Sequence, residues 1–132
     1  MTEVSFGAMV AADYIIVPAK AETDSLTGFD RLIDFVKNLR SSDLNRDLKI
    51  LGVILNNIIH QRATQKYIYR TTKENMGDLC FKQHIKGASV MEQARFSGYP
   101  ICLYDSSGEL ATAYKTLTRE ILKKIESIEE EK

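Results

Sequence analysis

The seven glycines of the sequence matter first for phosphate binding, because a P-loop needs glycines and a lysine in the pattern GxxxxGK[ST]. They are Gly7, Gly28, Gly52, Gly77, Gly87, Gly98 and Gly108. None of them precedes a lysine, and no pair has the required spacing. The sequence also has no GxGxxG dinucleotide loop and no apolar strand ending in a magnesium-binding aspartate. We therefore expect no phosphoryl-transfer site within these residues.

The histidines and cysteines do not form a recognisable catalytic or metal-binding pattern. His60 and His84 have no metal-type spacing with Cys, Asp or Glu, and surface or loop-edge positions suit them better. Cys80 and Cys102 lack CxxC spacing, which favours buried apolar thiols in the reducing cytosol. No GxSxG motif is present for a nucleophilic serine. We predict no catalytic residue and no metal site.

Two acidic residues follow the first apolar run of the chain. Glu22 and Asp24 come where open α/β sheets bind ligands, at the carboxyl end of a strand. Acidic side chains near the start of a helix also cap it or remain in solvent. The ordinary behaviour of acids at such positions favours capping or solvation over a ligand role.

The composition is that of a globular chain. Its 132 residues, 44% of them hydrophobic, suit a single domain spanning residues 1–132. The 18 basic and 18 acidic residues cancel, so net charge gives no sign of a nucleic-acid partner, although a local basic patch stays open. No apolar run approaches the roughly 20 residues that span a bilayer, and no signal peptide opens the chain. We expect a cytoplasmic protein that does not bind a membrane.

The apolar pattern alternates between strands and helices. Short apolar runs predict strands at residues 14–17, 49–56 and 79–85, and apolar spacing of three and four predicts helices at residues 27–40, 62–75 and 108–128. Residues 89–96 can add one or two helical turns. Such alternation predicts an α/β fold in three layers, with helices on both faces of about three parallel strands. Residues 14–17, 50–55 and 79–82 are expected to be parallel neighbours.

Three blocks in this order resemble the ParA/Soj family of partition ATPases, in the ParA/MinD superfamily. They are "AMVAADYIIVPAKAETDSLTGFDRLIDFV", "DLKILGVILNNIIHQRATQ" and "FKQHIKGASVMEQARFSGYPICLYDSSGELATAYKTLTREIL". The resemblance runs collinearly from about Phe6 to Leu122 without large gaps. It implies a P-loop-NTPase-like (Rossmann-like) fold, of which this chain corresponds to the C-terminal half.

The resemblance also implies a cofactor and partners. The family hydrolyses ATP with magnesium to segregate plasmids or chromosomes. Its Walker A loop, switches and magnesium-binding aspartate belong to the half that this sequence does not contain. The implied partners are a ParB-like protein and nonspecific DNA, with association to the nucleoid. We therefore expect no ATP hydrolysis by the 132 residues alone and no cofactor bound by them alone.

Carried over by position, the resemblance places the nucleotide base against four residues. Asn56 and Asn57 match the positions after the central strand that contact the base, and amides suit an adenine edge. Ile85 matches the apolar residue of the family's "IPR" segment, and Lys86 follows it. The sequence departs from the family here: Lys86 and Gly87 replace the proline and arginine. Val90 replaces a later arginine, and the family's "SEAPS" is replaced by Glu92, Gln93, Ala94, Arg95 and Phe96.

Basic residues occur in the predicted elements that neighbour these candidate base contacts along the chain. Five positions are candidates for DNA contact: Arg62, Lys66, Arg70, Lys82 and Arg95. The first three share one helical face, with Tyr67 and Tyr69 interleaved. Phosphate contact needs only reachable positive charge, so this face suits weak, salt-sensitive DNA binding. The zero net charge favours the alternative, an ordinary solvated helix face.

Two other functions are compatible with the pattern. One is a stand-alone interaction or DNA-binding module built on a remnant of this fold. The other is a MinD-type division ATPase, which would need a basic amphipathic C-terminal helix, whereas this chain ends in "EEEK". Without the other half of the family's sheet, one sheet edge and some apolar surface would be uncovered. We therefore predict a homo-oligomer that hides this edge.

Overall fold

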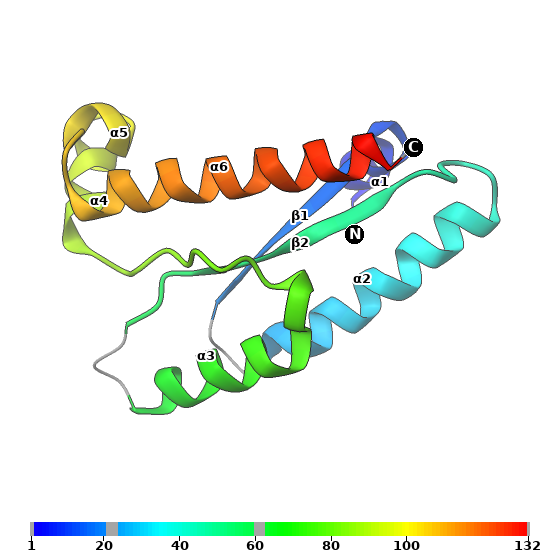
Figure 1. Ribbon diagram of the computed structural model, residues 1–132, viewed down its shortest axis with the longest axis horizontal. Helices are drawn as coiled ribbons and strands as arrows, with labels where there is room; N and C mark the ends of the chain where they lie inside the picture. Colours follow the sequence, from blue (N-terminus) through cyan, green and yellow to red (C-terminus); the bar gives the residue numbers. More distant parts are fainter. Residues whose placement is uncertain (1, 21–23, 60–62, 132) are drawn as a thin grey trace.

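The computed structural model describes residues 2–20, 24–59 and 63–131. The elements in chain order are α1 Glu3–Ala11, β1 Tyr14–Lys20, α2 Asp24–Ser41, β2 Lys49–Asn56, α3 Ala63–Met76, the 3₁₀ turn η1 Gly77–Leu79, α4 Ser89–Phe96, α5 Ile101–Tyr104 and α6 Glu109–Glu130. In Figure 1, α6 crosses above the two strands, whereas α2 and α3 lie below them. The predicted α/β fold with parallel pairing and helices on both faces is confirmed.

The two strands run in parallel through the centre of the molecule. Tyr14 lies opposite Lys49 at one end of the ladder, and Lys20 lies opposite Asn56 at the other. The Lys49 N–H donates to the carbonyl of Asp13 over 3.0 Å and begins the ladder. Both strands therefore have their carboxyl ends at the same end of the sheet, where open α/β sheets bind ligands.

Strand β2 sends side chains to both helical layers and carries a β-bulge. The register shifts between Ile15 and Ile16, because β2 carries an additional residue at Leu51. Ile50 packs with the cluster around α2, and Leu51 is buried in the cluster under α6. Ile50 and Leu51 therefore lie on opposite faces, as successive residues of a strand do, and the bulge shifts the register of the residues that follow.

The largest core cluster lies between the sheet and α6. Its buried members are Leu51, Phe81, Ile85, Ala94, Ile101, Leu110 and Leu117. At the far end of α6, the Tyr14 hydroxyl donates a hydrogen bond to the Glu129 carboxylate, 115 residues along the chain. The first strand is therefore attached directly to the end of the last helix.

The opposite face of the sheet is covered by two smaller clusters. Val36, Leu39 and Leu48 form one, against which Met9 and Val10 of α1 pack. The other consists of Leu55, Ile58 and Cys80, with Ile68, Tyr69 and Met76 of α3 packed against it. The apolar stripes of α2 and α3 account for this layer.

The segment expected as a third strand, residues 79–85, does not form one. Its first residue ends η1. One isolated parallel bridge lies within it, Val53 with Cys80, and a second follows directly after it, Ile58 with Lys86. The sheet of the described residues has two strands instead of about three. The expected parallel direction is observed, but the ladder is interrupted.

A carboxylate on α6 explains the interruption. Glu120 accepts hydrogen bonds from the backbone N–H groups of Lys82, over 2.6 Å, and Gln83, over 3.0 Å. An N–H group that is bonded to a side chain is not available to a neighbouring strand. This pairing joins residues 37 and 38 positions apart, which no local strand pattern indicates.

Gly52 allows the interrupted segment to lie directly on β2. A Cβ atom at this position would come within 2.7 Å of the Leu79 carbonyl oxygen and 2.8 Å of Phe81 Cε2. Real Cβ contacts essentially never become so short. The absence of a side chain at Gly52 is therefore a packing requirement.

The predicted helices are observed with ends shifted by one to three residues, as α2, α3 and α6. Two short helices, α1 and α5, were not expected. Helix α1 has apolar residues around most of its circumference and so lacks the one-sided stripe used to find helices; the Thr2 hydroxyl caps it by accepting from the Ser5 N–H over 3.3 Å. Within the described part of the chain, no helix is long and apolar enough to cross a membrane.

Candidate nucleotide site

The chain turns sharply at the carboxyl end of β2. Asn57 has a left-handed backbone, with φ of 56°, which asparagine tolerates better than most residues. Its N–H donates to Oδ1 of Asn56 over 2.9 Å. The Asn57 side chain is exposed at this edge. The two predicted base-contact asparagines therefore have different roles in the turn: Asn56 supports the backbone, and Asn57 is accessible.

Residues from a later segment lie against this turn. The Gly87 N–H donates to the Ile58 carbonyl over 3.0 Å, next to the bridge between Ile58 and Lys86. A Cβ atom at Gly87 would be only 2.6 Å from Oδ1 of Asn57, so glycine permits this approach. The structure thus brings Asn57 and Lys86, predicted from distant parts of the sequence, to one place.

Ile85 occupies a different position from the other predicted base contacts. Its side chain is only 3% exposed and belongs to the core beneath α6. Its backbone bonds on both sides, donating to the Leu55 carbonyl and accepting from the Ile58 N–H. Ile85 therefore anchors the segment to β2 in this structure.

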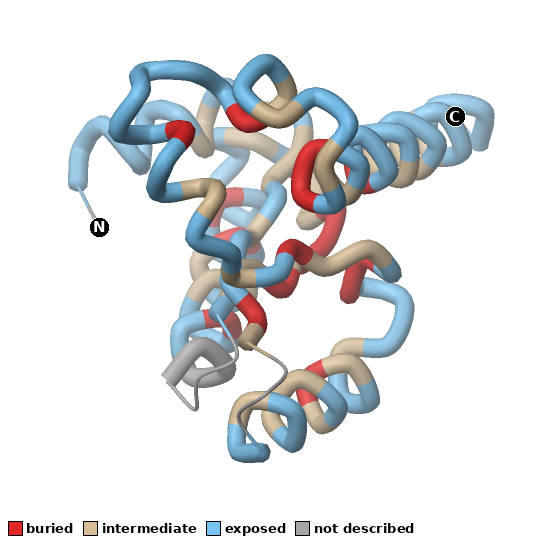
Figure 2. The backbone as a smooth tube through the Cα atoms, turned by 90° about the vertical axis from the view of Figure 1, so that its left-hand side faces the viewer, coloured by how far each residue is buried: buried red, intermediate tan, exposed pale blue. Residues whose placement is uncertain are grey.

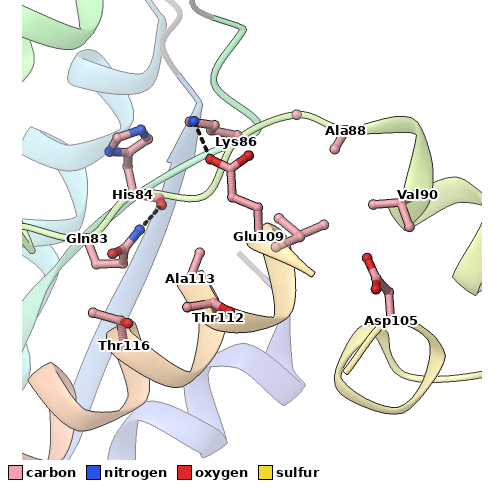
Figure 3. A pocket seen from close by; sticks show the side chains of 12 residues that line it. Gln83, His84, Lys86, Ala88, Val90, Asp105, Glu109, Thr112, Ala113 and Thr116 are labelled. Carbon is pink, nitrogen blue, oxygen red and sulfur yellow. Dashed lines mark hydrogen bonds and ion pairs between the residues drawn. The ribbon is translucent and has the colours of Figure 1, made fainter. Parts of the chain in front are cut away.

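A hollow of ≈ 670 Å³ opens beside this segment (Figure 3). It lies between residues 83–88, the start of α4, the α5–α6 connection and the first turns of α6. Its lining residues are Gln83, His84, Lys86, Gly87, Ala88, Val90, Asp105, Glu109, Leu110, Thr112, Ala113 and Thr116. The hollow combines apolar walls with amide, hydroxyl, imidazole and carboxylate groups, a mixture typical of small-molecule sites.

An ion pair joins two sides of the hollow. The Lys86 ammonium donates to the carboxylate of Glu109, in the first turn of α6 (Figure 3). This hydrogen bond and the charge of Lys86 lower the pKa of Glu109 below its ordinary value. Side-chain exposures of 49% and 78% make this a surface pair of small energy, which a ligand can displace at little cost.

His84 connects the hollow to α3. Its Nδ1 shares a hydrogen bond of 3.2 Å with the Tyr69 hydroxyl, and the two rings meet edge to face at 4.9 Å between centroids. The Lys73 ammonium lies 5.1 Å from the Tyr69 ring centroid and donates to the Lys82 carbonyl over 2.9 Å. With Glu120 bonding from the α6 side, the segment that lines the hollow is held from both layers.

The predicted DNA contacts do not form one cluster in this structure. Lys66 and Arg70 are exposed on α3, with Arg70 paired to Glu74 over 3.3 Å. Lys82 is exposed in the segment after η1. Arg95 lies on α4, which Figure 1 places near the start of α6, above the sheet and away from α3. Arg62 lies outside the described residues.

The remaining residues singled out in the sequence either contribute to the fold or lie outside the described residues. Cys80 is buried, and this burial raises the pKa of its thiol, as expected for an apolar thiol. Asp24 begins α2, and Glu22 and His60 lie outside the described residues. In residues 2–20, 24–59 and 63–131, no three His, Cys, Asp or Glu side chains meet as a metal site would require.

Sequence reasoning missed Asp105, Glu109 and Glu120. Each is an ordinary acidic residue in the sequence. Asp105 lies in the connection between α5 and α6, whereas Glu109 and Glu120 acquire their positions from the packing of α6 against residues 82–88. The pairing of Lys86 with Glu109 spans 23 residues. No local signal marks such pairs.

Comparisons with known proteins identify relatives along most of the chain. No family model matches it. The Soj sporulation initiation inhibitor of Bacillus subtilis is 28% identical over 117 residues, which are 89% of this chain and 46% of Soj. The chromosome partitioning protein ParA of Myxococcus xanthus is 31% identical over 134 residues, covering 91% of this chain and 42% of ParA. The chain is a ParA/Soj relative.

The ParA/Soj relatives are matched along their C-terminal part, and this chain spans about half their length or less. Among solved structures, a variant of Cyanothece McdA in complex with ATP superposes with a TM-score of 0.72 at 21% identity, covering 92% of this chain and 47% of McdA. At this identity the likeness shows the fold alone. The fold is thus that of one part of a ParA-type protein.

Proposed function

We propose that this chain is the C-terminal part of a ParA/Soj-type partition ATPase and forms the side of the nucleotide site that receives the base. The match to Soj and ParA supports this assignment. The observation that carries it is the position of the hollow at the carboxyl end of the parallel strands, where Lys86 and Gly87 line it and Asn57 lies against Gly87.

The residues present suit an adenine ring. The Asn57 amide can donate to and accept from a base edge. Val90 and Ala113 offer apolar surface, and Thr112 offers a hydroxyl. The ATP-complexed McdA variant has the same fold. In the full-length protein ATP would supply the phosphoryl group, and Asn57 and Lys86 would orient its base.

The residues present do not suit the triphosphate or magnesium. The sequence has no P-loop glycine pattern and no lysine following a glycine. Phosphoryl transfer depends on such a loop, its lysine and magnesium. We therefore assign no hydrolytic step to these 132 residues and expect no ATP turnover by them. Binding of ATP should be millimolar or weaker, about 4 kcal/mol or less.

Chemical-shift mapping tests this proposal. Adenosine and ATP are titrated separately into ¹⁵N-labelled chain with magnesium, and amide signals are followed. We expect similar shifts with both ligands, confined to residues 56–57, 83–88 and the start of α6. Shifts confined to other segments, or none by ~10 mM, would contradict the base site.

Two variants sharpen the assay. Asn57→Asp keeps the size and left-handed backbone of residue 57 but removes the amide donor, so the shifts should weaken. Lys86→Ala removes a lining side chain of the hollow. Lys66→Ala, a charge removal on exposed α3, is the matched control and should leave the adenosine response unchanged. ATP turnover that persists after repurification of the chain would refute the proposal that these residues bind the base but do not hydrolyse ATP.

The partition role includes DNA and a second protein. We propose weak nonspecific DNA contact through Lys66, Arg70 and Lys82, which are exposed on α3 and after η1. Arg62 and Arg95 remain candidates from the sequence. A ParB-like partner, cytoplasmic location and nucleoid association are proposed from the family alone. Partition of plasmid or chromosomal DNA by the complete protein follows from the same relationship.

A further inference from the structure

A second hollow, of ≈ 500 Å³, opens beside the beginning of β2. Side chains from both faces of β2 line it, because Ile50 packs toward α2 and Leu51 packs toward α6. Since β1 occupies one side of β2, this hollow lies on the other side. The segment after η1 first meets β2 at the bridge to Val53, so within the described residues no strand fills the space before it. We call this space the α2–α6 hollow.

The body of the α2–α6 hollow is apolar. Five apolar side chains line it besides those of β2: Phe29, Ile33 and Val36 from α2, Leu79 from η1 and Ile128 from α6. Leu79 is 38% exposed. Figure 2 shows the end of α6 that carries the C-terminus in the colours of exposed and intermediate residues alone. The apolar surface around the hollow is therefore only partly covered, and a ligand that enters it removes such surface from water.

The rim of the α2–α6 hollow is cationic. Four basic side chains line it: Lys37, Arg40, Lys49 and Lys124. None of its described lining residues is acidic. Of the four, Lys37 alone forms an ion pair with a described residue, Asp34, over 3.3 Å at side-chain exposures of 67% and 74%. Such an exposed pair is weak, so the rim is complementary to an anion.

Two of these cations are held in place without a carboxylate. Arg40 Nε donates to the Leu48 carbonyl over 2.7 Å, and the Lys124 ammonium donates to the Asp78 carbonyl over 2.9 Å. A guanidinium group has five N–H donors and an ammonium group has three, so both side chains keep donors for a ligand. The backbone carbonyls orient these side chains but leave their positive charge uncancelled.

Helix α2 gives the hollow a direction. Phe29 and Arg40 are eleven residues apart on one helical face, which is about 16 Å along the axis. Phe29 and Ile33 lie toward one end. Arg40 lies toward the other, where it bonds to Leu48, the residue before Lys49. The hollow is therefore elongated, with apolar side chains at one end and positive charges at the other.

We propose that the α2–α6 hollow binds a small amphiphilic anion with a single apolar chain, of the class of medium-chain fatty acids. The carboxylate lies beside Arg40 and Lys49, and the chain runs along α2 toward Phe29. A hollow of ≈ 500 Å³ is within the range of small-ligand sites, about 300–1,000 Å³. The inference goes beyond the proposed function, because this hollow shares no lining residue with the one beside residues 83–88.

The test uses three ligands that separate the apolar chain from the charge. Decanoate carries both, acetate carries the head group alone, and decyltrimethylammonium carries the same chain with the opposite charge. Each is titrated below its micelle concentration into the full chain, labelled with ¹³C at the isoleucine methyl groups. We expect decanoate to shift the signals of Ile33, Ile50 and Ile128 with a Kd of about 1 mM or lower. Its binding should be at least tenfold tighter than that of the other two ligands.

A matched pair of charge variants identifies the site. Lys49→Glu reverses a charge at the cationic end and should weaken decanoate binding at least fivefold. Lys115→Glu makes the same change at an exposed position of α6 outside the hollow and should leave the affinity unchanged. Ile33→Trp fills the apolar end without altering charge and should also weaken decanoate binding. Circular dichroism checks that each variant folds.

Three outcomes would overturn the inference: acetate reproduces the decanoate shifts, decyltrimethylammonium binds as tightly as decanoate, or Lys49→Glu and Lys115→Glu lose affinity equally. Decanoate shifts confined to residues 83–88 would also overturn it. The adenosine titration does not enter this test, so failure here is distinguishable from failure of the base site.

Discussion

The ion pair of Lys86 and Glu109 makes the hollow sensitive to acid. Lys86 lowers the pKa of Glu109 in the folded protein. The pair therefore stabilises the fold at pH values above 4.5, the ordinary pKa of a glutamate. That contribution is lost as the pH falls through the lowered folded-state pKa. The sign is that of a carboxylate held in its charged form.

Replacing Lys86 should therefore change the titration of the Glu109 carboxyl group. In Lys86→Ala, the pKa of Glu109 should rise toward 4.5, measured from the side-chain carboxyl carbon shift by NMR. The stability difference from the unsubstituted protein should be present near neutral pH and vanish in acid. Lys66→Ala should leave the Glu109 titration in place. An unchanged Glu109 midpoint in Lys86→Ala would show that the pair does not persist in solution.

Glu120 supports the segment next to the same hollow. Glu120→Ala should leave the Lys82 and Gln83 N–H groups without their acceptor, and we expect a loss of about 1–2 kcal/mol in the free energy of unfolding. Urea denaturation measures this loss. Glu126→Ala, at an exposed position of the same helix, is the control and should have little effect. Equal stability of both variants would contradict a stabilising role for the two Glu120 hydrogen bonds.

At the scale of elements, glycine has opposite consequences in β2 and α2. Gly52→Ala forces a Cβ atom against the Leu79 carbonyl and the Phe81 ring, and should cost about 1–3 kcal/mol through overpacking. Gly28→Ala meets nothing within 4 Å in a helix and should stabilise by about 0.5–1 kcal/mol. Thermal unfolding of both variants checks the pair. The same sign for both would refute the packing argument.

Helix α3 provides the proposed DNA contact with a measurable salt dependence. Lys66→Glu should weaken binding to duplex DNA of any sequence and reduce the slope of log affinity against log salt by about 0.9. Lys123→Glu makes the same charge change on α6 and is the control. Fluorescence anisotropy across a salt series measures both. Equal losses would assign the effect to net charge instead of α3.

The elements that were predicted correctly carry their signal locally. Helices α2 and α6 have apolar residues at spacings of three and four, and β2 is a continuous apolar run bounded by polar residues. Helix α1 was missed because its apolar residues do not favour one side. The third strand was wrong because the Glu120 carboxylate competes for its backbone, and that residue lies more than thirty positions away.

The candidate site also contains residues that the sequence predicted and residues whose role depends on tertiary packing. Asn57 and Lys86 were proposed through the family resemblance, and the structure places their segments together through the Gly87 contact. Ile85 is apolar, as the family pattern requires, but an apolar residue serves a core equally well, and its side chain lies there. Glu109 could not be predicted, because its relation to Lys86 depends on how α6 packs.

At the scale of the whole molecule, the open edge predicts self-association. Within the described residues β1 pairs only with β2, and the exposed side chains of Ile16, Val4 and Phe6 should make the isolated chain associate at high micromolar concentrations. Sedimentation velocity should show mass rising with concentration, and Ile16→Lys should reduce it. A monomer throughout the concentration series would contradict the expectation.

The hydrogen bond between Tyr14 and Glu129 has a consequence for biosynthesis. Its partners are 115 residues apart, so a ribosome making about 5–20 residues per second adds Tyr14 roughly 6–23 s before Glu129. Over that interval α6 cannot cover its face of the sheet, and the nascent strand emerges bare. Molecular chaperones that recognise extended apolar segments should therefore engage this protein early, and slowing of translation after β2 should prolong their residence.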